Sequence, residues 1–382
     1  MKIFQTTKRI IIGEGAFAAA AEEAVLLGAH KVLIVTGQNI IKTNYIDALE
    51  SKLNKNGIKA TVFSDVEPDP SYETALKAGS AAIHSSADTV IGVGGGSSLD
   101  VAKIASILAT NDKPITEMFG VNLVPKPGLK LILIPTTAGT GSEVTHISIL
   151  SDERERIKTG IVSQYLLPDI AIVDPVLTVS SPPDVTAYSG MDALVHAVEA
   201  FTSVNATVIT DTLAAKAIEL ISANLRRAYA NGDNMEARSA MAIASMMAGQ
   251  AFANAGVTAT HAFAYPIGAV FHIPHGIANS IMFPAVMKFN MTANLPKFAR
   301  IASLMGINTH NLTDRQSALK MVEFLQELIA DLRLPSCLSY YGVKESDIPS
   351  LATGVMKVTR ILANNPRKLT LKDAEEIYKN VL

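Results

Sequence analysis

An aspartate and a histidine stand four residues apart in an alanine-rich run of the sequence. The run 189–200 (SGMDALVHAVEA) predicts a helix that begins at Ser189 or Gly190 and carries Asp192 and His196. Positions four apart lie on one face of a helix, so the two side chains point the same way. A carboxylate oxygen and an imidazole nitrogen together suit a divalent metal such as iron or zinc. Two ligands do not complete a site, so the others must come from elsewhere in the chain.

Three further histidines lie close together in a segment without charged side chains. His261, His272 and His275 fall between Arg238 and Lys288, and no Asp, Glu, Lys or Arg occurs between those two residues. Burying an imidazole without a partner is costly, and binding to a metal would satisfy neutral imidazoles. The spacing alone does not select which of the three bind a metal. Asn, Gly, Pro and His interrupt the segment, so it predicts buried core helices rather than a transmembrane span.

Two loops rich in glycine and hydroxyl groups each follow an apolar run. Residues 92–100 read GVGGGSSLD and residues 135–143 read PTTAGTGSE. Glycines let a backbone approach a pyrophosphate closely, and a helix that begins in the first loop would offer free N–H groups. The alternatives are a capping box formed by Ser97 and Asp100 and a polar loop with serine–threonine turns. Because ligands of open α/β sheets bind at the carboxyl ends of strands, the two loops together favour dinucleotide binding.

Short apolar runs alternate with helical patterns through the first half of the chain. They predict strands at 1–12, 31–37, 61–63, 88–93, 131–134 and 170–173. Strands that are apolar throughout are typical of a parallel sheet covered on both faces, as in dinucleotide-binding folds. After the segment 180–183 (SSPP) the pattern is helical up to Leu382. We therefore predict an α/β dinucleotide-binding domain with a parallel sheet over residues 1–182 and an all-α metal-binding domain over residues 183–382.

Composition narrows the class of protein. The formal net charge is −2, which argues against a nucleic-acid partner because proteins that bind nucleic acids carry a basic face. The single cysteine, Cys337, fits a reducing compartment. The N-terminal residues do not show the cationic region followed by an apolar region that marks a secretory signal. We expect a cytoplasmic enzyme with no membrane or nucleic-acid partner.

Five motifs in one order carry a resemblance to a known family. They are GGGSSLD (94–100), PTTAGTGSEVT (135–145), DPVLT (174–178), GMDALVHAVEA (190–200) and HAFAYPIGAVFHIPHGIANSIMFP (261–284). From Gly13 to Arg367 the chain resembles the iron-containing, or group III, alcohol dehydrogenases. The resemblance implies their dehydroquinate synthase-like architecture. This is an N-terminal α/β nucleotide-binding domain and a helical C-terminal domain, with the active site in the cleft between them.

The resemblance also implies which residues form the site. The metal ligands would be one aspartate and three histidines, namely Asp192, His196, His261 and His275. The residues of the two cofactor loops would be Gly94, Gly95, Gly96, Ser97, Ser98, Asp100, Thr136, Thr137 and Thr140. Lys158 would lie beside the nicotinamide ribose and Leu177 near the adenosine. The alternative for Lys158 is a solvated charge in the charged run 152–158.

Departures from the family pattern bear on the cofactor. Many members carry an acidic residue after the second strand, where this chain has Gly37, Gln38 and Asn39. A carboxylate there would bind the adenosine ribose of NAD and repel a 2′-phosphate. Its absence slightly favours NADP(H) and is compatible with NAD(H). Asp69, which stands where many relatives have asparagine, is also expected near the cofactor.

A second departure concerns the proton relay. Many relatives have a histidine four residues after the third metal ligand, where this chain has Tyr265. A phenol has an unperturbed pKa of about 10 and would relay protons less readily at neutral pH. His272 is therefore the better candidate for the relay, and it could equally support a metal ligand.

Together these features predict a metal-dependent NAD(P)-linked alcohol dehydrogenase or aldehyde reductase. It would transfer hydride between a small alcohol and C4 of nicotinamide, with Fe²⁺, or Zn²⁺ in its place, polarising the substrate oxygen. We expect a homodimer or a larger homo-oligomer. The alternatives are a lyase or cyclase on the same architecture, a nucleotide-binding scaffold and a zinc glycerol dehydrogenase. The first needs Lys and Arg to hold a substrate phosphate, which the uncharged segment lacks, and a four-ligand set argues against the second.

Overall fold

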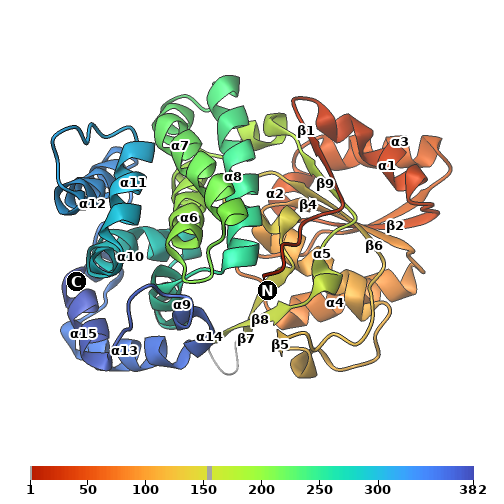
Figure 1. Cartoon of the computed structure of the whole chain (residues 1–382). Coiled ribbons are helices and arrows are strands. Elements are labelled where there is room, and N and C mark those ends of the chain that lie inside the picture. Colours follow the sequence, from red (N-terminus) through yellow and green to blue (C-terminus); the bar gives the residue numbers. More distant parts are fainter. Residues whose placement is uncertain (1, 153–156) are drawn as a thin grey trace. The chain divides into compact units, whose positions relative to one another are not determined.

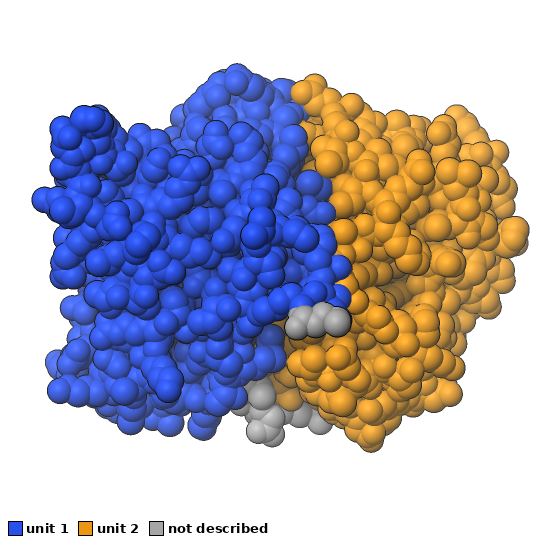
Figure 2. Space-filling model, in the orientation of Figure 1, with its two compact units in different colours: residues 1–4, 138–140, 181–382 blue, residues 5–137, 141–180 orange. Residues whose placement is uncertain are grey.

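The computed structural model describes residues 2–152 and 157–382. Contacts between Cα atoms divide the chain into two compact units, which Figure 2 colours separately. The helical unit contains residues 1–4, 138–140 and 181–382, and the α/β unit contains residues 5–137 and 141–180. Figure 1 labels most of the helices and strands of both units.

Six parallel strands form the main sheet of the α/β unit (Figure 1). Their order is β1-β9-β6-β4-β2-β3, and every neighbouring pair is parallel. The strands are β1 (Arg9–Ile12), β2 (Lys31–Val35), β3 (Lys59–Phe63), β4 (Thr89–Gly94), β6 (Lys130–Pro135) and β9 (Ile170–Val173). The predicted parallel sheet is confirmed. The first strand is shorter than the predicted 1–12, because the polar residues 5–8 (QTTK) precede it outside the sheet.

Alternate residues of the central strands pack into two separate cores of the α/β unit. Leu33 and Val35 of β2 join one core with side chains of α4 and α5, whereas Val32 and Ile34 join the other with side chains of α1 and α3. Successive side chains of a strand point to opposite faces, so both sets must be apolar when helices cover both faces. The helices of this unit are α1 (Ala20–Leu26), α2 (Gln38–Ile41), α3 (Tyr45–Lys55), α4 (Tyr72–His84) and α5 (Gly96–Leu108).

A small second sheet in the α/β unit was not predicted from the sequence. It has the strand order β5-β8-β7, with β7 and β8 antiparallel. Its strands are β5 (Gly120–Val121), β7 (Ile147–Asp152) and β8 (Ile157–Val162). Only Ser148 and Leu150 of β7 are fully buried, so this strand lacks the continuous apolar run that revealed the main sheet. The residues 153–156 of the charged run lie outside the described part of the chain.

The helical unit contains no strand among its described residues, as predicted. Its helices are α6 (Pro183–Thr202), α7 (Val208–Ala230), α8 (Met235–Ala255), α9 (Ala259–Phe271), α10 (His275–Asn290), α11 (Leu295–Leu304), α12 (Asp314–Asp331), α13 (Ile348–Lys357), α14 (Thr359–Leu362) and α15 (Leu371–Lys379). Helices α8, α9 and α10 carry most of the uncharged segment. None of the described helices is long and apolar enough to cross a membrane.

Helix α6 begins earlier than the sequence predicted. Its first residue is Pro183, and proline is tolerated there because the first N–H groups of a helix have no intrahelical acceptor. Gly190 lies inside the helix, where a Cβ would be 2.3 Å from Cδ1 of Leu225 on α7. The prediction that Ser189 or Gly190 caps the helix is therefore wrong. The glycine instead permits close packing of α6 against α7.

Candidate metal centre and nucleotide loops

Helix α6 presents three buried ionisable side chains of the helical unit. Asp192 and His196 are 3% and 5% exposed, and Glu199 is fully buried. Nδ1 of His196 lies 3.9 Å from Oδ2 of Asp192. The three residues follow the spacing of four and then three that keeps side chains on one helix face. The predicted pairing of Asp192 with His196 on one face is therefore present in the structure.

Helices α9 and α10 bring two more histidines to this pair. Nε2 of His261 lies 3.0 Å from Nε2 of His196 and 3.9 Å from Oδ1 of Asp192. Nε2 of His275, the first residue of α10, also lies 3.9 Å from Oδ1 of Asp192. Ligand atoms of Asp192, His261 and His275 all fall within 4.8 Å of one another. The structure thus brings together the four side chains that the resemblance selected.

The chemistry of these four side chains fits a divalent cation. Two imidazole Nε2 atoms at 3.0 Å face each other, and Oδ1 of Asn279 is buried without a hydrogen-bond partner among the described residues. Burial lowers the pKa of His196 to about 4, so its ring is neutral, as metal binding requires. Burial raises the pKa of Asp192, but the neighbouring imidazoles outweigh this effect and leave it below its usual value. One ionised carboxylate and neutral imidazoles form a donor set suited to iron or zinc.

Two further residues contact the four side chains, and neither was predicted from the sequence as part of the site. Asn279 donates from Nδ2 to Oδ1 of Asp192 at 2.7 Å. A carboxylate oxygen of Glu199 lies 2.7 Å from Nδ1 of His261. The sequence held a signal for both, because Glu199 follows His196 by one helical turn and Asn279 follows His275 by one helical turn. Buried partners of this kind orient metal-binding side chains.

The two predicted proton-relay residues have different surroundings. The ring of Tyr265 on α9 is half-buried, and its centroid lies 6.1 Å from that of His275. His272 ends α9 in a left-handed conformation with φ of 54°. Its side chain is exposed and forms no hydrogen bond with a described residue. Of these two residues, Tyr265 is the one whose ring lies beside a side chain of the cluster.

The two glycine- and hydroxyl-rich loops of the α/β unit follow adjacent strands. Gly94 at the end of β4 pairs with Pro135 at the end of β6. The N–H of Thr136 donates to the carbonyl of Gly94 at 2.9 Å, and a Cβ at Gly95 would lie 3.5 Å from Oγ1 of Thr137. The first N–H groups of α5 begin at Gly96, which follows directly. Both loops thus lie at the carboxyl edge of one parallel sheet, where nucleotides bind. Thr140 belongs to the short segment grouped with the helical unit.

Asp100 does not form the capping box that its spacing from Ser97 allowed. The N-cap of α5 is Gly95, without a side-chain cap. The Asp100 carboxylate instead accepts hydrogen bonds from Oγ of Ser142 at 2.6 Å and from the N–H of Ile149 at 2.8 Å. The capping alternative is therefore wrong. Asp100 joins α5 to the end of the second loop and to β7.

A buried lysine next to Asp100 holds the same segment. Nζ of Lys103 donates to Oγ of Ser142, Oγ1 of Thr145 and the carbonyl of Ile147, at 2.7, 2.9 and 2.7 Å. Burial lowers the pKa of Lys103 to about 8 and raises that of Glu143, which is 2% exposed, to about 7. The second loop therefore ends on a buried polar cluster that fixes it to α5.

The substitution Glu143→Gln is expected to change how stability depends on pH. The unfolded chain ionises Glu143 near its ordinary pKa of 4.5, whereas the folded chain ionises it near 7. Between these values the unfolded state binds fewer protons, so wild-type stability falls as pH rises through this window. The glutamine variant cannot ionise at this position. Its free energy of unfolding should therefore rise relative to that of wild type by on the order of 3 kcal/mol between about pH 4.5 and pH 7. Denaturant unfolding across this window measures it, and parallel curves for the two proteins would contradict it.

The remaining predicted cofactor residues have well-defined surroundings in the α/β unit. Nζ of Lys158 lies 2.8 Å from Oδ1 of Asp69, and the lysine side chain is only 8% exposed, so it is not a solvated charge. Asp69 has a left-handed backbone with φ of 50°. Gly37 precedes α2 in an extended conformation. Leu177 is buried in the apolar core that also contains α1 and α3.

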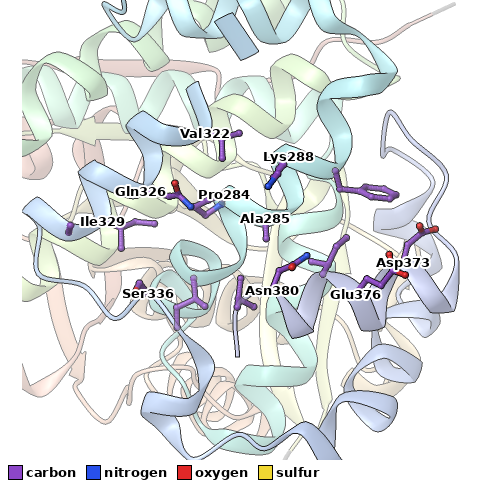
Figure 3. A pocket seen from close by; sticks show the side chains of 15 residues that line it. Pro284, Ala285, Lys288, Val322, Gln326, Ile329, Ser336, Asp373, Glu376 and Asn380 are labelled. Atoms are coloured by element: carbon purple, nitrogen blue, oxygen red, sulfur yellow. The ribbon is translucent and has the colours of Figure 1, made fainter. Parts of the chain in front are cut away.

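The pocket in Figure 3 lies elsewhere in the helical unit. It has a volume of about 660 Å³ and is lined mainly by side chains of α10, α12 and α15. None of its lining residues belongs to the cluster of Asp192 and the three histidines. We therefore assign it no part in the metal centre.

These features define a class of protein. A parallel sheet with two glycine- and hydroxyl-rich loops at its carboxyl edge is combined in one chain with a helical unit in which Asp192, His261 and His275 could hold a metal ion. Residues 7–175 match the family described as iron-containing alcohol dehydrogenase, and residues 186–382 match the C-terminal part of the same family. The chain belongs to the iron-containing alcohol dehydrogenase family.

Known relatives resemble the chain over nearly its whole length. It is 44% identical over 371 residues to long-chain-alcohol dehydrogenase 1 of Geobacillus thermodenitrificans. The alignment covers 96% of this chain and 93% of the relative. A crystal structure of a 1,3-propanediol oxidoreductase superimposes with a TM-score of 0.97 at 36% identity and covers all of both chains. Sulfoacetaldehyde reductase from Bifidobacterium kashiwanohense, solved with NAD⁺, gives a TM-score of 0.91 at 30% identity and covers 100% of this chain and 98% of the other.

The family confirms the predicted activity class. The protein is an oxidoreductase that acts on the CH–OH group of alcohols and interconverts them with aldehydes, linked to a nicotinamide cofactor and a metal. The predicted fold class, an α/β sheet unit followed by a helical unit, is confirmed as well.

Proposed function

We propose that Asp192, His196, His261 and His275 hold one divalent metal ion, Fe²⁺, at which small alcohols and aldehydes are interconverted. The observation that carries the proposal is the convergence of these four buried or half-buried side chains from α6, α9 and α10. The same donor set accepts Zn²⁺, and the family name supports iron. A bound ion supplies Lewis-acid polarisation of the substrate oxygen.

The protein's own residues set the charge and shape of this centre. Among the four side chains only the ionised Asp192 carboxylate carries a negative charge. This charge attracts a cation, and the three imidazoles bind it as neutral ligands. Phe252 stacks on His196, with ring centroids 4.2 Å apart and an angle of 16° between the rings. Such an apolar face excludes water beside the imidazole and suits an aliphatic substrate of small or medium size. Buried, stacked side chains also lose little freedom when an ion binds.

For the proton we propose that His272 exchanges it with solvent. Its exposed ring follows α9, which carries His261, and precedes α10, which begins with His275. Imidazole is the side chain that best transfers protons near neutral pH. Tyr265 beside His275 supports the cluster in this proposal and is the alternative relay.

For the cofactor we propose that the loops 94–98 and 136–137 receive the pyrophosphate, and that NADP(H) is accepted in preference to NAD(H). Backbone N–H groups at the start of α5 suit a pyrophosphate. Lys158, whose Nζ pairs with Asp69 at 2.8 Å, would lie beside the nicotinamide ribose in this proposal, as the resemblance implies. The preference for NADP(H) rests on Gly37, which leaves no carboxylate after β2 to repel a 2′-phosphate.

The substitution Gly37→Asp should reverse this preference. The backbone at Gly37 is extended (φ −108°, ψ 161°), so aspartate can adopt its conformation. The added Cβ would lie 3.1 Å from the carbonyl oxygen of Val66, which must move slightly in both this variant and its control. We expect kcat/KM for NADPH relative to NADH to fall by at least about tenfold, which corresponds to about 1.4 kcal/mol of repulsion. Gly37→Asn is the matched control, because it adds similar volume without charge. An equal fall in the asparagine variant would show that volume, not charge, decides.

We further propose that residues 1–182 form the nucleotide-binding domain and residues 183–382 the metal-binding domain, and that the chain works in the cytoplasm as a homodimer or larger homo-oligomer. Sedimentation or light scattering of the purified protein measures its oligomeric state.

One experiment tests the proposed function as a whole. Metal content of the anaerobically purified protein is measured together with oxidation of NADH and NADPH against a panel of aldehydes. We expect about one divalent ion per chain and metal-dependent reduction of small aliphatic aldehydes. A protein that reduces these aldehydes at full rate after its metal has been removed would contradict the proposal. Zinc content without reduction of these aldehydes would instead favour a glycerol dehydrogenase.

A further inference from the structure

Glu199 is a fully buried carboxylate with an unusual set of partners. It has no exposed side-chain surface, and its only ion-pair partner among the described residues is His261. Each carboxylate oxygen is within hydrogen-bond distance of two groups. Oε2 accepts from the N–H of Thr258 at 2.9 Å and contacts Nδ1 of His261 at 2.7 Å, and Oε1 accepts from Oγ1 of Thr258 at 2.7 Å and from the N–H of Thr260 at 2.6 Å.

Three of these four groups belong to the start of α9. The first N–H groups of a helix have no intrahelical acceptor and carry a partial positive charge, so a carboxylate is stabilised there. Glu199 accepts from two of these N–H groups, those of Thr258 and Thr260, and the N–H of Ala259 between them donates to Oδ1 of Asn365 at 3.2 Å. The entry of α9 is thereby fixed to α6 through one side chain.

The fourth contact reaches the metal cluster. An ionised carboxylate can only accept, so Nδ1 of His261 carries the proton of the 2.7 Å hydrogen bond. In neutral imidazole the other nitrogen then holds the lone pair. That nitrogen, Nε2, lies 3.0 Å from Nε2 of His196 and 3.9 Å from Oδ1 of Asp192. The lone pair therefore points into the cluster.

We propose that Glu199 is a positioning residue of the metal centre. It fixes the Nδ1-protonated tautomer of His261 and the start of the helix that carries this histidine, and its charge makes the imidazole a stronger ligand. The inference rests on the metal site proposed above and assigns a role to a residue outside its four ligands. Carboxylates that accept from metal-bound histidines raise ligand basicity in this way.

The substitution Glu199→Gln removes the charge and one acceptor oxygen of this side chain while keeping its size nearly the same. Its NH₂ group replaces one oxygen, so one N–H at the start of α9 loses its acceptor in either orientation of the amide. His261 loses the negative charge, and in one orientation it also loses its acceptor. Thr258→Val is the matched control, because it removes the hydroxyl bond to the same carboxylate and leaves the contact with His261 intact.

The test is the dissociation constant for Zn²⁺, measured by competition with a chromogenic chelator, beside thermal unfolding of each protein. We expect Glu199→Gln to bind Zn²⁺ on the order of 10–100-fold more weakly than wild type, and Thr258→Val to keep wild-type affinity even where its unfolding temperature falls. Equal affinity of Glu199→Gln and wild type would overturn the inference. So would an equal loss of affinity in Thr258→Val.

A measurement on the wild-type protein does not depend on whether the variant folds. Nitrogen-15 NMR of the Zn²⁺-loaded protein should show Nδ1 of His261 protonated and Nε2 bound to the metal, and the reverse assignment would overturn the inference. His275→Ala distinguishes the two proposals. Loss of Zn²⁺ in His275→Ala beside retention in Glu199→Gln overturns the role of Glu199 alone, whereas absence of binding in wild type overturns the metal site and this inference with it.

Discussion

Replacing His275 with alanine is expected to abolish metal retention and turnover. Nε2 of His275 lies 3.9 Å from Oδ1 of Asp192 and within 4.8 Å of the ligand atom of His261. Without it the cluster keeps one carboxylate and two imidazoles and loses the side chain that α10 contributes. Because a bound metal contributes several kcal/mol to transition-state stabilisation, we expect kcat/KM for aldehydes to fall by about 10³-fold or more. Metal analysis and steady-state kinetics measure the two losses.

Cofactor binding should survive this change, since the residues proposed to receive the pyrophosphate, 94–98 and 136–137, belong to a different compact unit. Fluorescence titration with NADH and NADPH checks it. His310→Ala is the control, because His310 is an exposed histidine outside the cluster and its loss should leave metal content and kinetics unchanged. Full activity of a metal-free His275→Ala protein would refute the metal mechanism.

The second large effect is expected from Gly94→Ala in the first nucleotide loop. Gly94 has φ of +152°, and an added Cβ would lie 2.6 Å from Oγ and 2.7 Å from Cβ of Ser98. Ser98 lies in the first turn of α5, so this turn must shift, and its N–H groups then miss the position that a pyrophosphate would take. Backbone strain of this kind costs about 1–3 kcal/mol. We therefore expect the dissociation constant for the nicotinamide cofactor to rise by at least about tenfold.

A glycine with similar backbone demands but open surroundings provides the control. Gly57 has φ of +76° after α3, and a Cβ there would meet nothing within 4 Å. Gly57→Ala should cost folding stability without changing cofactor affinity. Equal cofactor affinity of Gly94→Ala and wild type would show that the start of α5 does not bind the pyrophosphate.

Local patterns were sufficient to predict the fold class. The apolar runs at β2, β4, β6 and β9 indicated a parallel sheet because helices cover both faces, so neither face can be polar. The spacing of four residues predicted that Asp192 and His196 lie side by side, because positions four apart share one face of a helix. The choice of His261 and His275 from three histidines came from the family resemblance, since spacing within a loop and two helices does not say which rings meet. Their role as ligands stays a prediction.

Some local predictions failed where packing overrode the pattern. The pattern predicts that a helix begins at Ser189 or Gly190, but Gly190 lies inside α6, where its small size permits close contact with Leu225. Ser97 and Asp100 have the spacing of a capping box, but the carboxylate of Asp100 is held by Ser142 and Ile149. In both cases the contacts of the residue are with side chains or backbone groups more than thirty positions away, which a local pattern does not contain.

The sequence by itself determined the strands of the main sheet, the helical character of the second unit, the two glycine- and hydroxyl-rich loops and the pairing of Asp192 with His196, because these depend on neighbours within a few residues. Only the tertiary structure decided the order of the strands, the ion pair between Asp69 and Lys158, and the contact between Glu199 and His261. A glutamate in a helix has the same sequence signature whether it faces water or an imidazole. The spacing of Asp192 and His196 on one helix therefore predicted half of a metal site, whereas the contact of Glu199 on α6 with His261 on α9 depends on how these two helices meet.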